Sequence, residues 1–281
     1  SDYRPLLEIG HGSSCKVYKS TVKSSPNTYV AIKVINNQFF QDKDTFRLIR
    51  REIAILSQLK NEYLVDFIGY NNDPEQPFWI INKYYETGNL QKANKRLNPY
   101  QKTKISFEIA QGMEYLRSEN IIHRDLKPEN ILLEGNVKSN DIKPKISDFG
   151  LARKDSVLSK SIRTGTPNYM APEVINGSFY NFKADVYSFG MVLWELYSID
   201  ISFRYKNIDD FFKKKLKNGN QSLNDLEKLI LETTKFNPDE RPSFNDIIKQ
   251  MIDKKIAFNG SNQKLVDTFY NRKNDERNSN H

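Results

Sequence analysis

Apolar positions in the first 85 residues alternate in the way that β-strands require. Residues 29–35 form a β-branched run, and residues 78–84 form a second apolar run that ends before Gly88. Alternate side chains of a strand share a face, so Ala31 and Lys33 would point to one side of a sheet. We therefore expect the front of the chain to be mainly β-sheet.

One helix interrupts this strand-rich part, over residues 45–60. Its apolar stripe repeats at helical spacing and comprises Phe46, Ile49, Ile53 and Leu56. Glu52 borders the stripe, because it follows Ile49 by three positions and precedes Leu56 by four. The sequence thus predicts a helix that carries a carboxylate beside its packing face.

The remainder of the chain has mostly helical periodicity. Helices are expected at residues 185–197, which are apolar nearly all round and so buried, and at 226–234 and 244–255. A further helix carries the stripe Ile105, Ile109, Met113 and Leu116. Residues 259–281 end in a polar stretch without apolar periodicity, and we expect this tail to be partly disordered.

A strand-rich front and a helix-rich back predict an α+β fold of two lobes, with a ligand-binding cleft between them. The expected boundaries are residues 1–85 for the small lobe and residues 86–258 for the large lobe. The chain of 281 residues is ample for a buried core. It has no internal repeat and no run of about 18 apolar residues, so no membrane segment is expected.

Charge and cysteine content narrow the partners and the compartment. The net charge of +8 mildly favours acidic partners. The lysines lack the aromatic interleaving of a nucleic-acid groove, so nucleic acid is not expected as a main partner, although a basic nucleic-acid-binding module stays an alternative. The single cysteine, Cys15, cannot form an internal disulfide, which favours the cytoplasm or the nucleus. The chain begins Ser1-Asp2 without an apolar leader, and we expect it to be part of a longer protein.

A pair of glycines, Gly10 and Gly12, opens the segment G-H-G-S-S-C-K-V at residues 10–17. Two glycines alone fit a simple hairpin turn. A dinucleotide-binding loop would lead into a helix, whereas this segment continues as a strand. Because glycine carries no Cβ, such a hairpin lets backbone N–H groups approach phosphates closely.

Lys33 stands inside an apolar strand, where lysine is uncommon and costly unless it is paired. An edge lysine that faces water is the alternative interpretation. Glu52 is a candidate partner for Lys33, and its own alternative is a solvated carboxylate on the helix surface.

The decisive signal is a set of motifs in the second half of the chain. The sequence H-R-D-L-K-P-E-N spans residues 123–130, D-F-G spans residues 148–150, and A-P-E spans residues 171–173. With the glycine pair and V-A-I-K at residues 30–33, five separate motifs occur in one order. Over residues 6–256 the chain resembles the eukaryotic protein kinase superfamily. The resemblance implies a bilobal kinase fold, ATP and Mg²⁺ as cofactors, and protein substrates.

The resemblance assigns the phosphoryl transfer to the loop around Asp125. Asp125 would orient the substrate hydroxyl and accept its proton, and Lys127 would neutralise the transferring phosphoryl group. Thr166 would contact both of them on the substrate-binding side.

The resemblance also implies the residues that hold the nucleotide phosphates. Lys33 would bind the α- and β-phosphates and pair with Glu52. Asn130 and Asp148 would bind Mg²⁺, a hard cation that takes oxygen ligands.

The implied ATP site comprises Ile9, Gly10, Gly12, Val17, Ala31, Lys33, Lys83, Tyr85 and Leu132. Val17, Ala31 and Leu132 would enclose the adenine, while backbone groups of Lys83 and Tyr85 would contact its edge.

Other family positions imply framework contacts. Asp185 would anchor His123 from the buried helix, and Glu173 would pair with Arg241.

Four features depart from the family pattern. Cys15 replaces a glycine and is either a tolerated small side chain or a reactive thiol at the mouth of the cleft. Asn82 places a polar amide at the gatekeeper position. Residues 138–141 form an expected surface insertion, and residues 199–221 match the usual substrate-docking helix poorly.

The type of kinase follows from short motifs. Lys127 and residues 165–170 resemble serine/threonine kinases, whereas residues 185–190 and 194–196 resemble tyrosine kinases and the tyrosine-kinase-like group. The mixture indicates a serine/threonine kinase of the tyrosine-kinase-like group, acting in signalling. A dual-specificity kinase and a pseudokinase-like scaffold are the alternatives; a pseudokinase would have lost a charged catalytic residue, and none is lost.

Regulation is expected at the loop over residues 148–173. In this family an arginine at the position of Arg124 commonly binds a phosphate on that loop. Ser161 and Thr164 are the candidate regulatory sites, and Ser161 is preferred because it lies twelve residues before Glu173.

Overall fold

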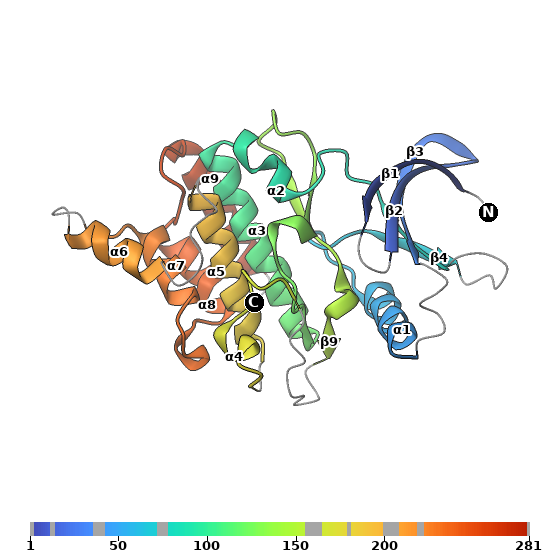
Figure 1. Ribbon diagram of the computed structural model, residues 1–281. Coiled ribbons are helices and arrows are strands. Elements are labelled where there is room, and N and C mark those ends of the chain that lie inside the picture. Colours follow the sequence, from blue (N-terminus) through green and yellow to red (C-terminus); the bar gives the residue numbers. More distant parts are fainter. Residues whose placement is uncertain are drawn as a thin grey trace.

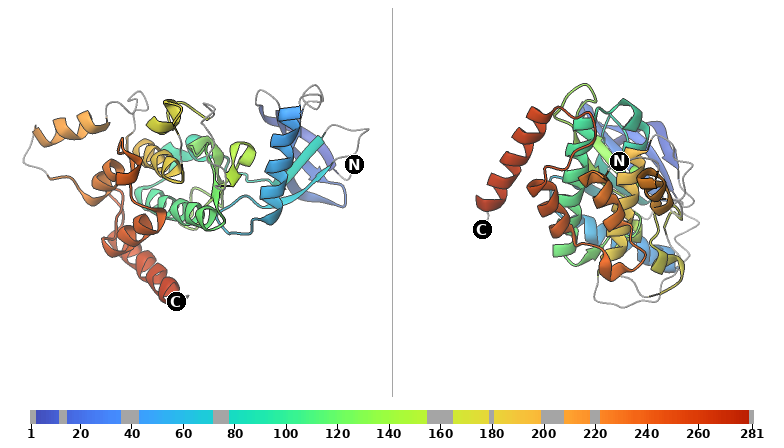
Figure 2. Two further views of the ribbon diagram at one scale, coloured as in Figure 1. Left: turned by 90° about the horizontal axis from the view of Figure 1, so that it is seen from below. Right: turned by 90° about the vertical axis from the view of Figure 1, so that its left-hand side faces the viewer.

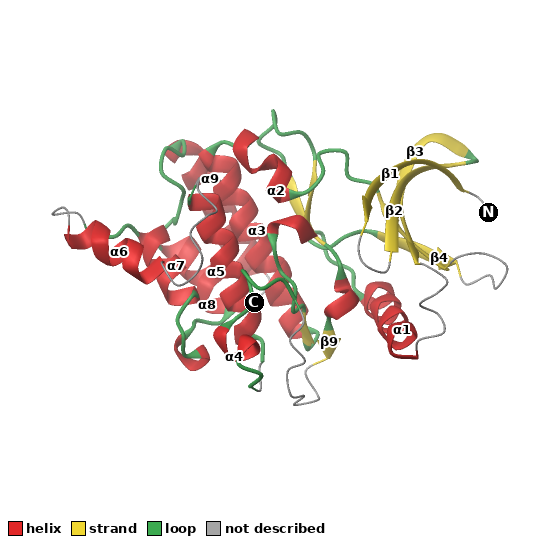
Figure 3. Ribbon diagram, in the orientation of Figure 1, coloured by secondary structure: helices red, strands yellow, loops and turns green. Residues whose placement is uncertain are grey.

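The architecture is taken from a computed structural model. It describes residues 3–11, 15–35, 43–71, 78–154, 165–178, 181–198, 208–217 and 222–279. Strands gather at one end of the molecule and helices at the other (Figures 1 and 3). This arrangement confirms the expected α+β class. Among the described helices, none has the length and apolar character needed to cross a membrane.

The small lobe is built on an antiparallel sheet with the strand order β1-β2-β3-β5-β4. Its strands are β1 Tyr3–His11, β2 Cys15–Val22, β3 Ser25–Ile35, β4 Phe67–Asn71 and β5 Phe78–Lys83. Helix α1, Lys43–Gln58, lies beside this sheet (Figure 1). The runs predicted at 29–35 and 78–84 are therefore strands, and the predicted helix at 45–60 forms with its bounds shifted by two residues.

The two faces of this sheet have different neighbours. One face carries a separate buried cluster that comprises Val30, Ile32, Trp79 and Ile81. Ala31 and Lys33 alternate with that cluster, so they belong to the opposite face. Lys33 is paired in register with Ile80, which belongs to the main core. The alternation along β3 thus directs Lys33 toward the large lobe.

The large lobe is helical. Its helices are α2 Leu90–Ala93, α3 Pro99–Ser118, α4 Pro172–Ile175, α5 Lys183–Tyr197, α6 Ile208–Lys217, α7 Asp225–Thr233, α8 Phe244–Asp253 and α9 Gln263–Ser279. Helix α3 begins at Pro99 because Asn98 and Gln101 form a capping box and proline suits the first helical position. Helix α5 has thirteen successive buried residues, from Ala184 to Leu196, as its continuous apolar sequence predicted.

Two short antiparallel pairs of strands position the loops of the site. One pairs β6, Ile121–Ile122, with β9, Arg153–Lys154, and the other pairs β7, Ile131–Glu134, with β8, Lys143–Ile146. Residues 123–130 thus lie between β6 and β7, and residues 147–152 lie between β8 and β9. The H-R-D and D-F-G segments are held side by side by these ladders.

The C-terminal tail is a correction to the sequence expectation. Residues 259–281 were expected to be partly disordered, but residues 263–279 form helix α9 (Figure 2). Val266, Phe269 and Tyr270 are buried on one side of it. With Lys273 they are spaced at i, i+3, i+4 and i+7, which is a helical stripe that the many polar residues between them obscure.

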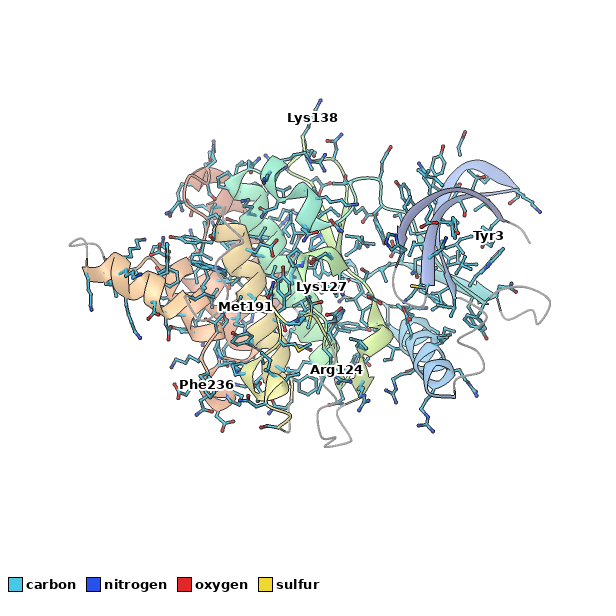
Figure 4. All side chains as sticks on the ribbon, in the orientation of Figure 1. Tyr3, Arg124, Lys127, Lys138, Met191 and Phe236 are labelled. Atoms are coloured by element: carbon cyan, nitrogen blue, oxygen red, sulfur yellow. The ribbon has the colours of Figure 1, made fainter. Side chains whose placement is uncertain are left out.

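Two segments of the large lobe lie at the surface, and one of them, residues 138–141, was expected there. The lysine-rich sequence at residues 213–217 lies on α6, where Lys213, Lys214 and Lys217 are exposed and Lys215 pairs with Glu227. Residues 138–141 are exposed between β7 and β8, and Lys138 projects from the top of the molecule in Figure 4.

Candidate active site

An ion-paired lysine connects the two lobes. Lys33 on β3 has its Nζ 2.9 Å and 3.0 Å from the two carboxylate oxygens of Glu52 on α1. The same Nζ lies 3.3 Å from Oδ1 of Asp148, which follows β8 in the large lobe. The predicted pairing of Lys33 with Glu52 is confirmed. One cation therefore ties together the sheet, the helix and the D-F-G segment.

The charges of this trio follow from burial and pairing. Burial alone would lower the pKa of Lys33, but the carboxylates of Glu52 and Asp148 outweigh it and raise that pKa well above its ordinary value. The positive charge of Lys33 lowers the pKa of Asp148, against the effect of burial. Lys33 and Asp148 are therefore both charged at neutral pH.

Asp125 is surrounded by hydrogen-bond donors. Its Oδ1 accepts from the backbone N–H of Thr166 at 3.0 Å and from the Thr166 hydroxyl at 3.1 Å. Its Oδ2 lies 2.8 Å from Nζ of Lys127 and 3.0 Å from Nδ2 of Asn130. Lys127 also donates to the Thr166 hydroxyl at 2.6 Å. The expected contacts of Thr166 with Asp125 and Lys127 are confirmed.

Asp185 on α5 holds the loop that carries Asp125 through two backbone hydrogen bonds. Oδ2 of Asp185 accepts from the N–H of His123 at 2.7 Å, and Oδ1 accepts from the N–H of Arg124 at 2.9 Å. The His123 ring lies edge-on to Phe149, with ring centroids 5.2 Å apart, and its Nε2 is 3.0 Å from the carbonyl oxygen of Ser147. The predicted anchoring of His123 by Asp185 is confirmed. These contacts lock the H-R-D segment to the D-F-G segment.

Asn130 and Asp148, the residues expected to bind Mg²⁺, lie next to each other. Asn130 uses its Nδ2 on Asp125, which leaves its amide oxygen for another ligand. Its backbone oxygen accepts from the N–H and the hydroxyl of Ser147, at 2.8 Å and 2.9 Å, and this brings it beside Asp148. In the described part of the chain, no group of three or more His, Cys, Asp or Glu could hold a metal alone. This donor set suits Mg²⁺, which is usually bound through one or two carboxylates together with substrate phosphates.

The hinge between the lobes is stabilised by four charged residues, Asp66, Lys83, Glu134 and Lys145, which we call the hinge cluster. Nζ of Lys83 lies 2.5 Å from Glu134 and 3.6 Å from Asp66. Nζ of Lys145, which is buried, lies 3.5 Å from Asp66 and 3.4 Å from Glu134. The Tyr85 hydroxyl donates to Asp66 Oδ2 at 2.9 Å. The sequence did not reveal this cluster, because its members come from four separate segments.

The residues that were expected to enclose the adenine lie on β2, β3 and β7. Val17 is in register with Lys33, Ala31 is in register with Asn82, and Leu132 on β7 forms a bridge with Asn89. Oδ1 of Asn82 is buried without a hydrogen-bond partner among the described residues.

Other predicted positions are less constrained, or lie outside the described part of the chain. Ile9 is exposed on β1, Gly10 is in register with Val17, and Cys15 packs at the edge of the core. Gly12, Ser161 and Thr164 lie outside the described residues. Arg124 and Lys127 lie close to the centre of the molecule, near the junction of the lobes (Figure 4).

The fold and this site define a protein kinase catalytic domain. Residues 3–258 match the family model of the protein kinase domain. The chain therefore belongs to the protein kinase family, as the sequence motifs predicted.

Individual relatives agree with this class. A probable serine/threonine-protein kinase of Dictyostelium discoideum is 35% identical over 256 residues, which is 87% of this chain and 59% of that protein. The serine/threonine-protein kinase VIK of Arabidopsis thaliana is 31% identical over 268 residues, 89% of this chain and 59% of that protein. The probable serine/threonine-protein kinase kinY of Dictyostelium discoideum is 32% identical over 280 residues, 85% of this chain and 45% of that protein. The chain thus spans between 45% and 59% of the length of these relatives.

Proposed function

We propose that this protein is an ATP-dependent serine/threonine kinase that requires Mg²⁺ and phosphorylates protein substrates. The observation that carries the proposal is the assembled constellation: the trio Lys33–Glu52–Asp148 on one side and the cluster Asp125–Lys127–Thr166 on the other. Phosphoryl transfer depends mainly on positioning and charge neutralisation, and both halves are in place.

Each residue has a distinct task in the proposed reaction. Lys33 binds the α- and β-phosphates of ATP, and Glu52 holds its ammonium group in the cleft. Asn130 and Asp148 would hold a magnesium ion, which would supply positive charge to neutralise the phosphates. Asp125 orients the substrate hydroxyl and takes its proton as the phosphoryl group moves onto the oxygen. Lys127, beside Asp125, neutralises the charge on that phosphoryl group.

The adenine site of the proposal is formed from both lobes. Ile9, Gly10, Gly12, Val17 and Ala31 come from the small lobe, Leu132 comes from the large lobe, and Lys83 and Tyr85 present backbone groups at the hinge. The hinge cluster and the Tyr85–Asp66 hydrogen bond support this assignment, because they fix the backbone that would contact the adenine edge.

The serine/threonine specificity rests on Lys127 and Thr166. Their 2.6 Å hydrogen bond places both beside the carboxylate of Asp125, where a short hydroxyl-bearing side chain must enter. The names of the three relatives agree with this specificity. We assign the protein to the tyrosine-kinase-like group because residues 185–190 and 194–196 combine tyrosine-kinase-like sequence with this serine/threonine loop.

The direct test is incubation of the protein with Mg²⁺-ATP and a mixed protein substrate, followed by phosphoamino-acid analysis. The proposal predicts phosphoserine and phosphothreonine with little phosphotyrosine. Equal phosphotyrosine would indicate the dual-specificity alternative. Nucleotide binding without turnover would indicate the pseudokinase-like scaffold.

A further inference from the structure

Helix α9 lies beyond the residues that match the protein kinase family, which end at residue 258. It packs on α3 and α8 (Figure 2). The Phe107 ring on α3 lies edge-on to Phe269 and to Tyr270, with ring centroids 5.4 Å and 5.5 Å apart. The Tyr270 hydroxyl donates to the carbonyl oxygen of Ile256 at 2.6 Å. These contacts hold α9 in one register on the large lobe.

This register places a lysine of α9 in the interior. Lys273 is only 7% exposed, although α9 is otherwise polar at its end. Its Nζ donates to the hydroxyl of Tyr63 at 3.2 Å and to Glu276 Oε2 at 2.8 Å. Tyr63 is itself 4% exposed and lies between α1 and β4. A buried ammonium group is costly unless it is paired, so these contacts select one position for Tyr63 relative to α9.

Tyr63 belongs to the segment that braces the D-F-G residues. Its carbonyl oxygen accepts from the N–H of Ile146 at 2.8 Å, and the N–H of Val65 donates to the carbonyl oxygen of Ile146 at 2.9 Å. Ile146 ends β8 and precedes Asp148 by two residues. The junction is tightly packed, because a Cβ at Gly112 on α3 would lie 2.8 Å from Ile146 Cδ1 and 3.1 Å from Tyr63 Cβ. A displacement of Tyr63 is therefore passed to Ile146.

The same segment leads directly from the helix that carries Glu52. Only the stretch after Gln58 separates α1 from Tyr63, and the N–H of Leu59 still donates to the carbonyl oxygen of Ile55 at 3.2 Å. The position of Tyr63 thus bears on both carboxylates that contact Lys33.

We propose that Lys273 is a positioning residue for phosphoryl transfer, which acts through Tyr63 and Ile146 to hold Asp148 in its place beside Lys33. The inference rests on the proposed kinase function. Helix α9, which lies outside the residues that match the family, would thus help to align Asp148. The competing interpretation is that α9 only adds stability to the large lobe.

The test compares Lys273→Met with a matched control on the same helix. Arg272→Met changes the adjacent residue, whose side chain is 61% exposed, and should leave activity unchanged. Lys273→Met should lower kcat by between about two- and thirtyfold, the range of coupling seen through packed networks. Lys273→Arg should recover much of the loss, because it restores a cation with donors at that place.

A second readout separates positioning from stability. Amide hydrogen exchange of the nucleotide-free protein should accelerate by roughly tenfold at Val65 and Ile146 in Lys273→Met, with little change in α8. Tyr63→Phe removes only the hydroxyl and should lower kcat similarly, and the double variant should lose no more than either single variant.

Each outcome decides the matter. A lower melting temperature with unchanged kcat and unchanged exchange at Ile146 would overturn the proposal in favour of a stabilising role only. If Lys273→Met does not fold, full activity of Tyr63→Phe would overturn it equally. An inactive wild-type protein would instead contradict the proposed kinase function.

Discussion

The carboxylate of Asp125 accepts four hydrogen bonds or ion pairs from three neighbours, which fix its orientation before any substrate arrives. Thr166 occupies one oxygen, and Lys127 and Asn130 occupy the other. Asp125, which we propose as the base, is held in this way and needs no rearrangement of the loop when a substrate hydroxyl approaches. Its contribution should therefore be to the chemical step and not to nucleotide binding.

The first prediction concerns Asp125→Asn. The variant keeps the size of the side chain but cannot accept a proton, so turnover should fall by roughly 10²- to 10⁴-fold. ATP affinity, measured by calorimetry, should change little because Asp125 does not contact the nucleotide in the proposed site. Asp253→Asn, at an exposed position on α8, is the control. Near-normal turnover of Asp125→Asn would refute the assignment of the base.

Arg241 shows how a single buried side chain connects distant segments. Its guanidinium donates to both carboxylate oxygens of Glu173 at 2.7 Å and 2.8 Å. It also donates to the carbonyl oxygens of Lys183, Lys235 and Phe236. The pairing with Glu173 was predicted from the sequence and is confirmed. The three carbonyl contacts could not be predicted, because any residue supplies a carbonyl oxygen.

The second prediction is that Arg241→Lys destabilises the protein by roughly 2–4 kcal/mol. An ammonium group keeps the charge but cannot form the two parallel bonds to Glu173 while also reaching three carbonyl oxygens. Urea unfolding measures the difference, and Arg277→Lys on α9 is a control with a single side-chain contact to Asn245. A loss no larger than that of the control would show that the fork geometry is unimportant.

At the scale of the elements, helix α5 carries a buried acid, Glu195, that contacts Tyr169. The hydroxyl of Tyr169 donates to Oε2 of Glu195, and both residues are buried. Burial raises the pKa of Glu195, against the effect of the Tyr169 hydrogen bond, and the negative charge of Glu129 raises it further. The native state therefore holds a proton on Glu195 at pH values where the unfolded chain has lost it.

The third prediction follows from that sign. Where the native state binds more protons than the unfolded state, stability falls as pH rises. Glu195→Gln keeps an acceptor for Tyr169 and removes the titration, so its stability relative to the wild type should increase as pH rises from about 4.5 to neutrality. Urea unfolding of both proteins at several pH values measures the difference, in which other groups cancel. A difference that is constant with pH would contradict the shift at Glu195.

Helix and strand positions were largely predictable because periodicity records which face is buried. The stripe at residues 46–56 placed Glu52 correctly beside the packing face of α1. Helix α9 was missed although its stripe is present, because only three of its four buried positions are apolar and the fourth is Lys273. A buried lysine cannot be distinguished from an exposed one in the sequence, since its partners lie elsewhere in the chain.

At the scale of the whole molecule, hydrogen bonds hold the backbone of Arg124 in one conformation near the junction of the two lobes. Arg124 has a positive φ of 71°, an uncommon conformation for a residue with a side chain. Its N–H is held by Asp185, and its Nη1 is 3.4 Å from the carbonyl oxygen of Leu151. Arg124 is thus fixed beside Leu151, near the start of the sequence segment 148–173 that contains Ser161; Ser161 itself is outside the described residues.

The fourth prediction concerns this loop. We expect autophosphorylation of Ser161, whose phosphate would add about −1.5 to −2 charge and bind Arg124. Mass spectrometry after incubation with Mg²⁺-ATP should find the modification. Ser161→Ala and Arg124→Ala should each lower activity by roughly 5- to 100-fold. Ser156→Ala is the control on the same loop. An unmodified Ser161, or a fully active Ser161→Ala, would place the switch elsewhere or exclude it.

The strand-rich and helix-rich halves were predictable from periodicity, and the contacts among Lys33, Glu52 and Asp148 were predictable in part because motifs of fixed spacing mark these residues. The protein substrate was not, since its recognition depends on surfaces that no short motif encodes. The hinge cluster has the same character: Asp66, Lys83, Glu134 and Lys145 are ordinary surface residues by sequence, and only folding assembles them.

The ion pairs of the hinge cluster differ in how strongly they depend on the salt concentration of the solvent. Lys83 and Asp66 are nearly half exposed, whereas Lys145 is buried between the same two carboxylates. Dissolved ions screen the outer pairs over a Debye length of about 8 Å at physiological ionic strength and affect the inner lysine much less. The ion pairs of the exposed Lys83 are therefore sensitive to salt, whereas those of the buried Lys145 are much less so. We expect the ion pairs of Lys83 to weaken as salt concentration rises, while those of Lys145 persist.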